Sequence, residues 1–245
     1  PDGWGSVQGR EMPALFRDLP VSRTLPLRWK DEGISGLPAL FVDGEKECVT
    51  MARNDGEEPL FSFESLPLIG NHNVENGAMA AAAIRLLGIV PENIGSLFEG
   101  FKGLPHRCEF VACVKGVKYI DDSKGTNVAS SATALSSIQG PKVVILGGQG
   151  KGEDYAPLAD AVRRNATAAV VLGHEKEKIV SALRAAGFQG IWEASSMEEA
   201  VLTASRIVPE NGTVLLSPAC TSWDMYPNYK KRGEHFRKIV TGLER

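Results

Sequence analysis

An α/β fold with a mainly parallel sheet is predicted for the C-terminal part of this sequence of 245 residues. Two observations predict it. Short apolar runs alternate with segments of helical periodicity, and clusters of polar residues directly follow several of these runs. Alternating strands and helices imply crossover connections, which make neighbouring strands parallel and cover both faces of the sheet.

The expected strands are short apolar runs, each followed by a turn and a helical pattern. They are residues 117–120, 142–146, 168–172, 190–192 and 213–216. After the first of them, helical periodicity resumes near Thr126. Ser196 is expected to cap a later helix, with Glu199 completing a capping box.

The first part of the chain is less regular and is predicted to be an α+β segment. Short β-like stretches at 39–42 and 48–51 flank Asp43-Gly44, which is a hairpin signal, and a second turn falls at 54–56. We expect no self-sufficient core before residue 70, and we interpret this region as the edge of a larger domain.

Helical patterns follow. One helix is expected from Asn73, where alanines are dense, to a stop at Gly88. A second short helix should place four apolar residues on one face. They are Ile94, Leu97, Phe98 and Phe101. Gly103-Leu104-Pro105 then breaks the chain, so we divide it into residues 1–102 and a Rossmann-like domain at 103–245.

Composition excludes several classes of protein. The formal net charge of -3 gives no basic excess for nucleic acid, and no apolar run approaches the roughly 20 residues of a membrane span. The four cysteines form no CxxC pair and the four histidines are scattered, so neither a disulfide framework nor a zinc site is expected. We expect a cytoplasmic protein with free thiols. Because Pro1 stands where an initiator methionine would, we also expect a fragment, a processed form or an otherwise incomplete chain.

Three of the expected strands end in unusual polar motifs. They are DDSKGTN at 121–127, GGQGKGED at 147–154 and SPACTSWD at 217–224. The carboxyl ends of parallel strands share one edge of a sheet, so these motifs should meet in a crevice. Two lysines, the hydroxyls of Thr126 and Ser222, and glycine backbone could there hold a doubly anionic small molecule through charge-assisted hydrogen bonds.

Each motif also has a simpler interpretation. No Ser or Thr follows Lys151, as a Walker A loop requires, and Glu153 stands where a GxGxxG fingerprint has its last glycine, so this motif alone is a glycine turn with a solvated lysine. The acids and lysine of DDSKGTN alone would be a helix start with a weak surface ion pair. Cys220 would be a small buried hydrophobe.

Five blocks together resemble the consecutive signatures of the Mur ligase family. They are GNHNVENGAMAAAA at 70–83, GLPHRCE at 103–109, DDSKGTN at 121–127, LGGQGKGED at 146–154 and LLSPACTSWDMYPNYKKRG at 215–233. The resemblance covers roughly residues 66–241. It is nearest to the D-glutamate-adding branch, because the DNPR signature of the diaminopimelate-adding branch is absent and SKGTN replaces the SYNANP-like run of the D-alanyl-D-alanine-adding branch.

The resemblance implies peptide-bond formation in peptidoglycan precursor synthesis. In such enzymes ATP, with Mg²⁺, phosphorylates the terminal carboxylate of UDP-N-acetylmuramoyl-L-alanine. The amine of D-glutamate then attacks the acyl phosphate, and phosphate leaves. It also implies a monomer that binds neither nucleic acid nor membrane.

Residue roles follow from the same resemblance. The implied nucleotide contacts are Asn73, Asn76, Arg107 and Asp122. The implied D-glutamate contacts are Lys124, Thr126, Lys151, Ser222, Trp223 and Tyr229. Lys124 is also the implied catalytic residue near the reacting centre, and no metal ligand is assigned.

The sequence departs from the family pattern in two respects. Gln149 and Gly150 occupy a loop position that is often acidic, and the chain has no GKT or GKS phosphate loop, magnesium ligands or carbamylated lysine. We therefore predict that this chain alone does not catalyse ligation. Two alternatives stay open, namely a ligase similar to folylpolyglutamate synthase and a non-enzymatic domain that binds a small molecule.

Overall fold

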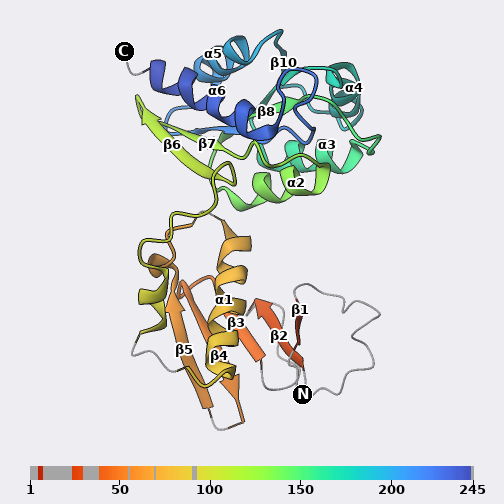
Figure 1. Cartoon of the computed structure of the whole chain (residues 1–245). Helices are drawn as coiled ribbons and strands as arrows, with labels where there is room; N and C mark the ends of the chain where they lie inside the picture. Colours follow the sequence, from red (N-terminus) through yellow and green to blue (C-terminus); the bar gives the residue numbers. More distant parts are fainter. Residues whose placement is uncertain are drawn as a thin grey trace. The chain divides into compact units, whose positions relative to one another are not determined.

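The computed structural model describes residues 5–7, 24–29, 39–54, 56–68, 70–89 and 93–243. The chain divides into two compact units, Pro1–Lys102 and Gly103–Arg245 (Figure 1). None of the described helices combines the length and the apolar character needed to cross a membrane.

The first unit is built on a five-stranded sheet with the order β1-β2-β3-β4-β5. Its strands are β1 (Gly5–Val7), β2 (Thr24–Trp29), β3 (Ala39–Asp43), β4 (Cys48–Arg53) and β5 (Gly56–Ser62). The first three are parallel to one another, and β3, β4 and β5 are antiparallel. Its helical elements are η4 (Phe63–Ser65), α1 (Asn71–Leu86) and η5 (Ile94–Phe98). Figure 1 shows α1 lying along this sheet.

The core of the first unit lies between its sheet and α1. Leu40 and Met51 of the sheet pack in one buried cluster with Ala78 and Ala81 of α1, and each of these four residues is at most 1% exposed. Small alanine side chains let the helix approach the sheet closely. This buried cluster joins strand residues to residues of α1, as expected of a segment that has no self-sufficient core before residue 70.

Two local expectations for this unit have different outcomes. The hairpin at Asp43 is confirmed, since β3 and β4 pair antiparallel and the Asp43 carboxylate accepts the backbone N–H groups of Glu45 and Lys46. The single apolar face after Pro91 is wrong. Ile94 is buried, but Leu97 and Phe101 are 49% and 48% exposed. The segment is a short 3₁₀-helix, whose tighter turn does not align these positions.

The second unit contains a six-stranded sheet with the order β10-β9-β8-β11-β7-β6. Its strands are β6 (Glu109–Val114), β7 (Val117–Asp121), β8 (Lys142–Gly147), β9 (Ala168–Leu172), β10 (Ile191–Glu193) and β11 (Thr213–Leu216). All neighbours are parallel except β6 and β7. The α/β class and all five expected strands are confirmed. We missed β6, an edge strand with only one fully buried residue.

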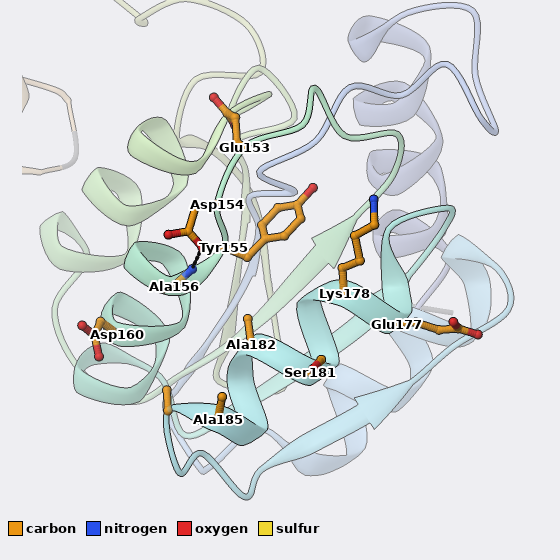
Figure 2. Close-up of a pocket in the computed structure, with 11 residues that line it drawn as sticks. Glu153, Asp154, Tyr155, Ala156, Asp160, Glu177, Lys178, Ser181, Ala182 and Ala185 are labelled. Carbon is orange, nitrogen blue, oxygen red and sulfur yellow. Dashed lines mark hydrogen bonds between the residues drawn. The ribbon is translucent and has the colours of Figure 1, made fainter.

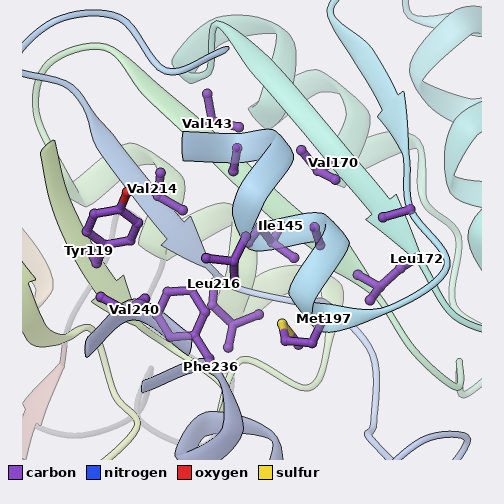
Figure 3. Packing of buried hydrophobic residues seen from close by; sticks show 14 of the residues in the cluster. Tyr119, Val143, Ile145, Val170, Leu172, Met197, Val214, Leu216, Phe236 and Val240 are labelled. Carbon is purple, nitrogen blue, oxygen red and sulfur yellow. The ribbon is translucent and has the colours of Figure 1, made fainter. Parts of the chain in front are cut away.

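Five helices cover this sheet. They are α2 (Val128–Ser137), α3 (Ala156–Asn165), α4 (Lys176–Ala185), α5 (Met197–Ile207) and α6 (Tyr229–Gly242). Alternate residues of the central strands, such as Val143 and Ile145, belong to one buried cluster that also contains residues of α5 and, from α6, Phe236 and Val240 (Figure 3). The intervening residue Val144 is equally buried, because α2, α3 and α4 cover the opposite face.

The predicted cap of α5 is confirmed in part. The Ser196 hydroxyl accepts the backbone N–H of Glu199. The Glu199 carboxylate, however, accepts the backbone N–H and hydroxyl of Ser195 and not the N–H of Ser196, so the capping box is shifted by one residue.

Candidate functional site

The three polar motifs follow three adjacent strands of the second unit. β11 lies between β7 and β8, and Leu216 at its end is in register with Asp121 on one side and Ile145 on the other. The loops that follow these strands therefore leave the sheet at the same edge. This is the crevice position that open parallel sheets use for ligands.

Backbone hydrogen bonds tie the loops together. Gln149 and Thr221 exchange both of their backbone bonds at 2.9 Å, and the Thr221 hydroxyl donates to the Gln149 carbonyl at 2.8 Å. The Ala219 N–H donates to the Gly125 carbonyl at 2.9 Å, which joins the 217–224 loop to the 121–127 loop. The three motifs thus form one connected structure.

Gly148 makes this connection possible. Its φ is 137°, and a Cβ there would lie 2.3 Å from the Thr221 carbonyl oxygen. Any side chain would therefore push the two loops apart. The packing of the two loops alone therefore requires glycine at position 148, whether or not the backbone there also contacts a ligand.

Lys124 and Tyr229 come together at the crevice. The Lys124 ammonium lies 4.3 Å from the centroid of the Tyr229 ring, which is within the range of a cation–π contact. The Lys124 backbone N–H donates to the His106 carbonyl at 3.0 Å. Thr126 and Tyr229 are half-buried, so each keeps accessible surface.

Ser222, Trp223 and Lys151 differ in exposure. Ser222 is 1% exposed, and its hydroxyl oxygen has no hydrogen-bond partner among the described residues. A buried hydroxyl without a hydrogen bond costs free energy, so a ligand group that forms a hydrogen bond with it would bind more tightly. Trp223 is 68% exposed and Lys151 is exposed, so the solvated state expected of this lysine from the motif alone is confirmed.

The four residues predicted to contact nucleotide lie in different environments. Asn76 and Arg107 are exposed, and Asn73 is half-buried on α1. Asp122 is 6% exposed, and its carboxylate accepts hydrogen bonds from the Ser217 hydroxyl at 2.6 Å and from the Cys108 N–H at 3.3 Å. Burial raises the pKa of Asp122 to about 6, although both hydrogen bonds favour the ionised form.

One group of described side chains has the spacing of metal ligands. It consists of His106, Glu109 and Asp121. His106 Nδ1 and an Asp121 oxygen are hydrogen-bonded at 2.7 Å, and the Glu109 carboxylate is bonded to Arg237 and to the His106 N–H. These atoms already satisfy one another. Magnesium also prefers oxygen ligands in an octahedron, so this group does not fit Mg²⁺.

Cys220 matches the simpler interpretation of its motif. It is fully buried, and burial raises the pKa of its thiol to about 11, so it is a poor nucleophile near neutral pH. The Tyr155 hydroxyl lies 3.3 Å from its sulfur. Tyr155 also borders a hollow of about 710 Å³ between α3 and α4, whose walls carry Asp160, Glu177 and small residues (Figure 2).

Three residues of this region escaped the sequence analysis. His106, Ser123 and Arg232 are buried and make polar contacts with the crevice loops. Arg232 stands in the run KKRG, where nothing separates it from its two solvated neighbours. Arg232 is buried on α6, one helical turn from Tyr229. Only the prediction of a helix through this run could have placed it on the same face as Tyr229.

Comparisons with known proteins bear on the same part of the chain. The family described as "Mur ligase, glutamate ligase domain" matches residues 106–220. The chain is similar to the UDP-N-acetylmuramoylalanine--D-glutamate ligase of Pelotomaculum thermopropionicum, with 42% identity over 80% of this chain and 43% of the relative. For the same enzyme of Alkaliphilus metalliredigens the identity is 37% over 84% of this chain and 45% of the relative. The chain spans less than half the length of these relatives.

Solved structures show the same fold at low identity. E. coli FolC in complex with ADP aligns with a TM-score of 0.62 at 16% identity, over 95% of this chain and 52% of that one. The MurF ligase from Thermotoga maritima in complex with ADP aligns with a TM-score of 0.57 at 18% identity, over 93% and 53%. The matched family domain, the 37% to 42% identity to the two relatives and this fold agree with the motif blocks, and residues 106–220 match the glutamate ligase domain of the Mur ligases.

Proposed function

We propose that this chain is part of an ATP-dependent ligase that adds D-glutamate to UDP-N-acetylmuramoyl-L-alanine in peptidoglycan precursor synthesis. The observation that carries the proposal is the convergence of the loops after β7, β8 and β11, where the buried Ser222 hydroxyl has no hydrogen-bond partner among the described residues. The names of the relatives supply the substrate class.

The crevice has the groups that a dicarboxylate needs. In the proposal, Lys124 and Lys151 donate charge-assisted hydrogen bonds to the two carboxylates, and the hydroxyls of Thr126 and Ser222 donate further hydrogen bonds to them. The aromatic rings of Tyr229 and Trp223 shield the bound amino acid from water. D-Glutamate would then offer its amine to an acyl phosphate, and Lys124 would stabilise the negative charge that develops in the tetrahedral intermediate.

ATP supplies the phosphate that makes the acceptor carboxylate electrophilic. We propose Asn73, Asn76, Arg107 and Asp122 as its contacts in this chain. The described residues do not offer a fitting Mg²⁺ site, so no step is assigned to the metal through them. We further propose a cytoplasmic monomer without nucleic-acid or membrane partners.

This polypeptide by itself should not ligate. Its 245 residues contain no GKT or GKS loop to hold a triphosphate, so the activated acyl phosphate cannot form. The expected result is no phosphate release when the purified chain is supplied with ATP, D-glutamate and UDP-N-acetylmuramoyl-L-alanine. Release that depends on all three substrates would overturn this expectation.

The binding role is tested by NMR and calorimetric titration of the chain with D-glutamate and L-glutamate. Weak binding that prefers the D enantiomer is expected, with shifts in residues 121–127 and 217–224. Lys151→Ala should abolish it. Lys118→Ala is the matched control. Lys118 is also an exposed lysine, and it lies near the amino end of β7, whereas the crevice loops follow the carboxyl ends of the strands. Absence of any shift at the highest soluble D-glutamate concentration, or equal effects of the two variants, would contradict a preformed site.

A folylpolyglutamate synthase-like ligase is the second candidate. Folylpolyglutamate synthase of Mycobacterium tuberculosis has the same fold at 15% identity, so the fold alone allows this candidate. The same titration separates the two candidates, because a preference for L-glutamate would contradict the D-glutamate proposal and support this one.

A further inference from the structure

Arg232 is a cation buried beneath the crevice. It projects from α6, is 1% exposed, and donates three hydrogen bonds to two of the crevice loops. Its Nε donates to the Ser123 hydroxyl at 2.9 Å, and one Nη donates to the Ser123 carbonyl at 2.8 Å. The other Nη donates to the Cys220 carbonyl at 3.0 Å.

The third loop also contacts this guanidinium. A Cβ on Gly148 would lie 3.2 Å from an Arg232 Nη, so the Gly148 backbone packs directly against it. Arg232 therefore touches the loops that follow β7, β8 and β11.

The charge of Arg232 is not matched by an adjacent carboxylate. Among the described residues, none forms an ion pair with it, and Asp121 and Asp224 act only from a distance. Burial lowers the pKa of Arg232 to about 10, so the group still carries its charge near neutral pH. A buried cation is costly unless the surrounding carbonyls are held in place to receive its donors.

Those carbonyls belong to residues next to the predicted binding groups. Ser123 directly precedes Lys124, and Cys220 lies two residues before Ser222. The Ser123 hydroxyl, which accepts from Arg232, also donates to the Tyr229 carbonyl at 2.8 Å. One guanidinium is thus connected through single hydrogen bonds or neighbouring residues to Lys124, Ser222 and Tyr229.

We propose that Arg232 is a positioning residue of this site. It fixes the 121–127 and 217–224 loops against each other and against α6, and its charge adds to the positive potential that a dicarboxylate meets in the crevice. The identity of the ligand rests on the proposed function. The holding of the loops rests on the contacts alone and is measurable without any ligand.

The test compares Arg232→Met and Arg232→Lys with two control variants in the same helix. Arg237→Met removes a half-exposed arginine that pairs with Glu109, and Val240→Ala destabilises the core without touching the loops. Backbone amide hydrogen exchange follows three bonds within and between the loops, from Lys124 to His106, from Ala219 to Gly125 and from Gln149 to Thr221. Affinity for D-glutamate and Tm are measured on each variant.

Arg232→Met should accelerate exchange of the three amides at least about tenfold, since charged hydrogen bonds are lost. It should weaken D-glutamate binding more than Val240→Ala does at equal loss of Tm. Arg232→Lys keeps the positive charge but loses the planar guanidinium and its several donors. Its Tm should therefore lie between those of Arg232→Met and wild type, while the three amides still exchange faster than in wild type. If Arg232→Met does not fold, Ser123→Ala removes the Nε acceptor and the tie to Tyr229, and it should accelerate exchange at Lys124.

Exchange that rises uniformly with the loss of Tm, as in Val240→Ala, would overturn the proposal, because it would give Arg232 a role in stability only. Unchanged exchange and affinity in Arg232→Lys would do the same. If the wild-type chain binds no D-glutamate while the exchange results hold, the ligand assignment fails and the positioning role stands.

Discussion

The ammonium of Lys124 lies 4.3 Å from the centre of the Tyr229 ring, although the two residues come from different ends of the second unit's sequence. Lys124 is anchored by its backbone N–H to His106, and the His106 ring stands edge-on to the Tyr229 ring with the centroids 6.0 Å apart. The lysine is thereby held at the mouth of the crevice with its charge directed over an aromatic face. A flexible surface lysine would lose far more rotamer freedom on meeting a substrate.

The ring of Tyr229, and not its hydroxyl, should matter for binding. Tyr229→Phe keeps the aromatic face and should leave D-glutamate affinity within about twofold of wild type. Tyr229→Leu removes the face while keeping apolar bulk, and it should weaken binding about two- to fivefold, since a partly exposed cation–π contact contributes about 0.5–1 kcal/mol. Calorimetric titration measures both. Equal losses in the two variants would show that the hydroxyl is the relevant group.

Gly148 should tolerate no side chain without disruption of the loop after β8. Gly148→Ala would place its methyl group 2.3 Å from the Thr221 carbonyl oxygen, so the Gln149–Thr221 pair must separate. We expect a loss of about 2–4 kcal/mol in the free energy of unfolding.

Gly152→Ala is the matched control. Gly152 has a φ of 79° but nothing within 4 Å of its would-be Cβ, so only the left-handed conformation costs energy, about 1 kcal/mol. Urea unfolding of both variants measures the difference. Similar losses would mean that backbone conformation, and not the contact with Thr221, limits this loop.

Much of the second unit could be predicted from the sequence because its central strands are buried on both faces and are separated by helices. Apolar runs such as 142–146 and 168–172 carry that signal without reference to any partner. β6 could not be predicted in this way. It is an antiparallel edge strand in which Phe110 and Cys113 face solvent, and its pairing with β7 is irregular near Phe110.

The loops of the site could be predicted from the sequence, but the buried residues that hold these loops in place could not. Polar residues after strands mark a crevice from local sequence alone. The contact between Arg232 and Ser123 spans 109 positions, and a buried arginine looks like a surface one until α6 is placed. Asp122 shows the same limit, because the carboxylate predicted to contact nucleotide is bonded to Ser217, 95 positions away.

The core behind α6 should dominate the stability of the second unit. Phe236 is fully buried among residues of the sheet and α5, so Phe236→Ala should cost about 3–5 kcal/mol in the free energy of unfolding. Phe110 offers the matched control, since it is 51% exposed on the edge strand β6. Phe110→Ala should change stability by no more than about 0.5 kcal/mol. A large loss in the Phe110 variant would indicate that its ring is covered in solution by something beyond the described residues.

The carboxyl group of Asp122 should make the folded chain less stable as the pH rises from about 4 to about 6. Burial raises the pKa of Asp122 from its ordinary value of 3.8 to about 6 in the folded state. Below about 4 the group is protonated in both states. Between the two values the unfolded chain loses the proton while the folded chain keeps it, so unfolding is favoured increasingly with pH.

The total loss across this window is on the order of 3 kcal/mol, and above about pH 6 the group contributes no further change. Asp122→Asn removes the titration, so its stability relative to wild type should improve by that amount between about pH 4 and pH 7. Urea unfolding of both proteins across this range measures the difference, and taking the difference cancels the titration of all other groups. A difference that stays constant with pH would show that Asp122 is ionised throughout, stabilised by its bonds from Ser217 and Cys108 more than burial disfavours it.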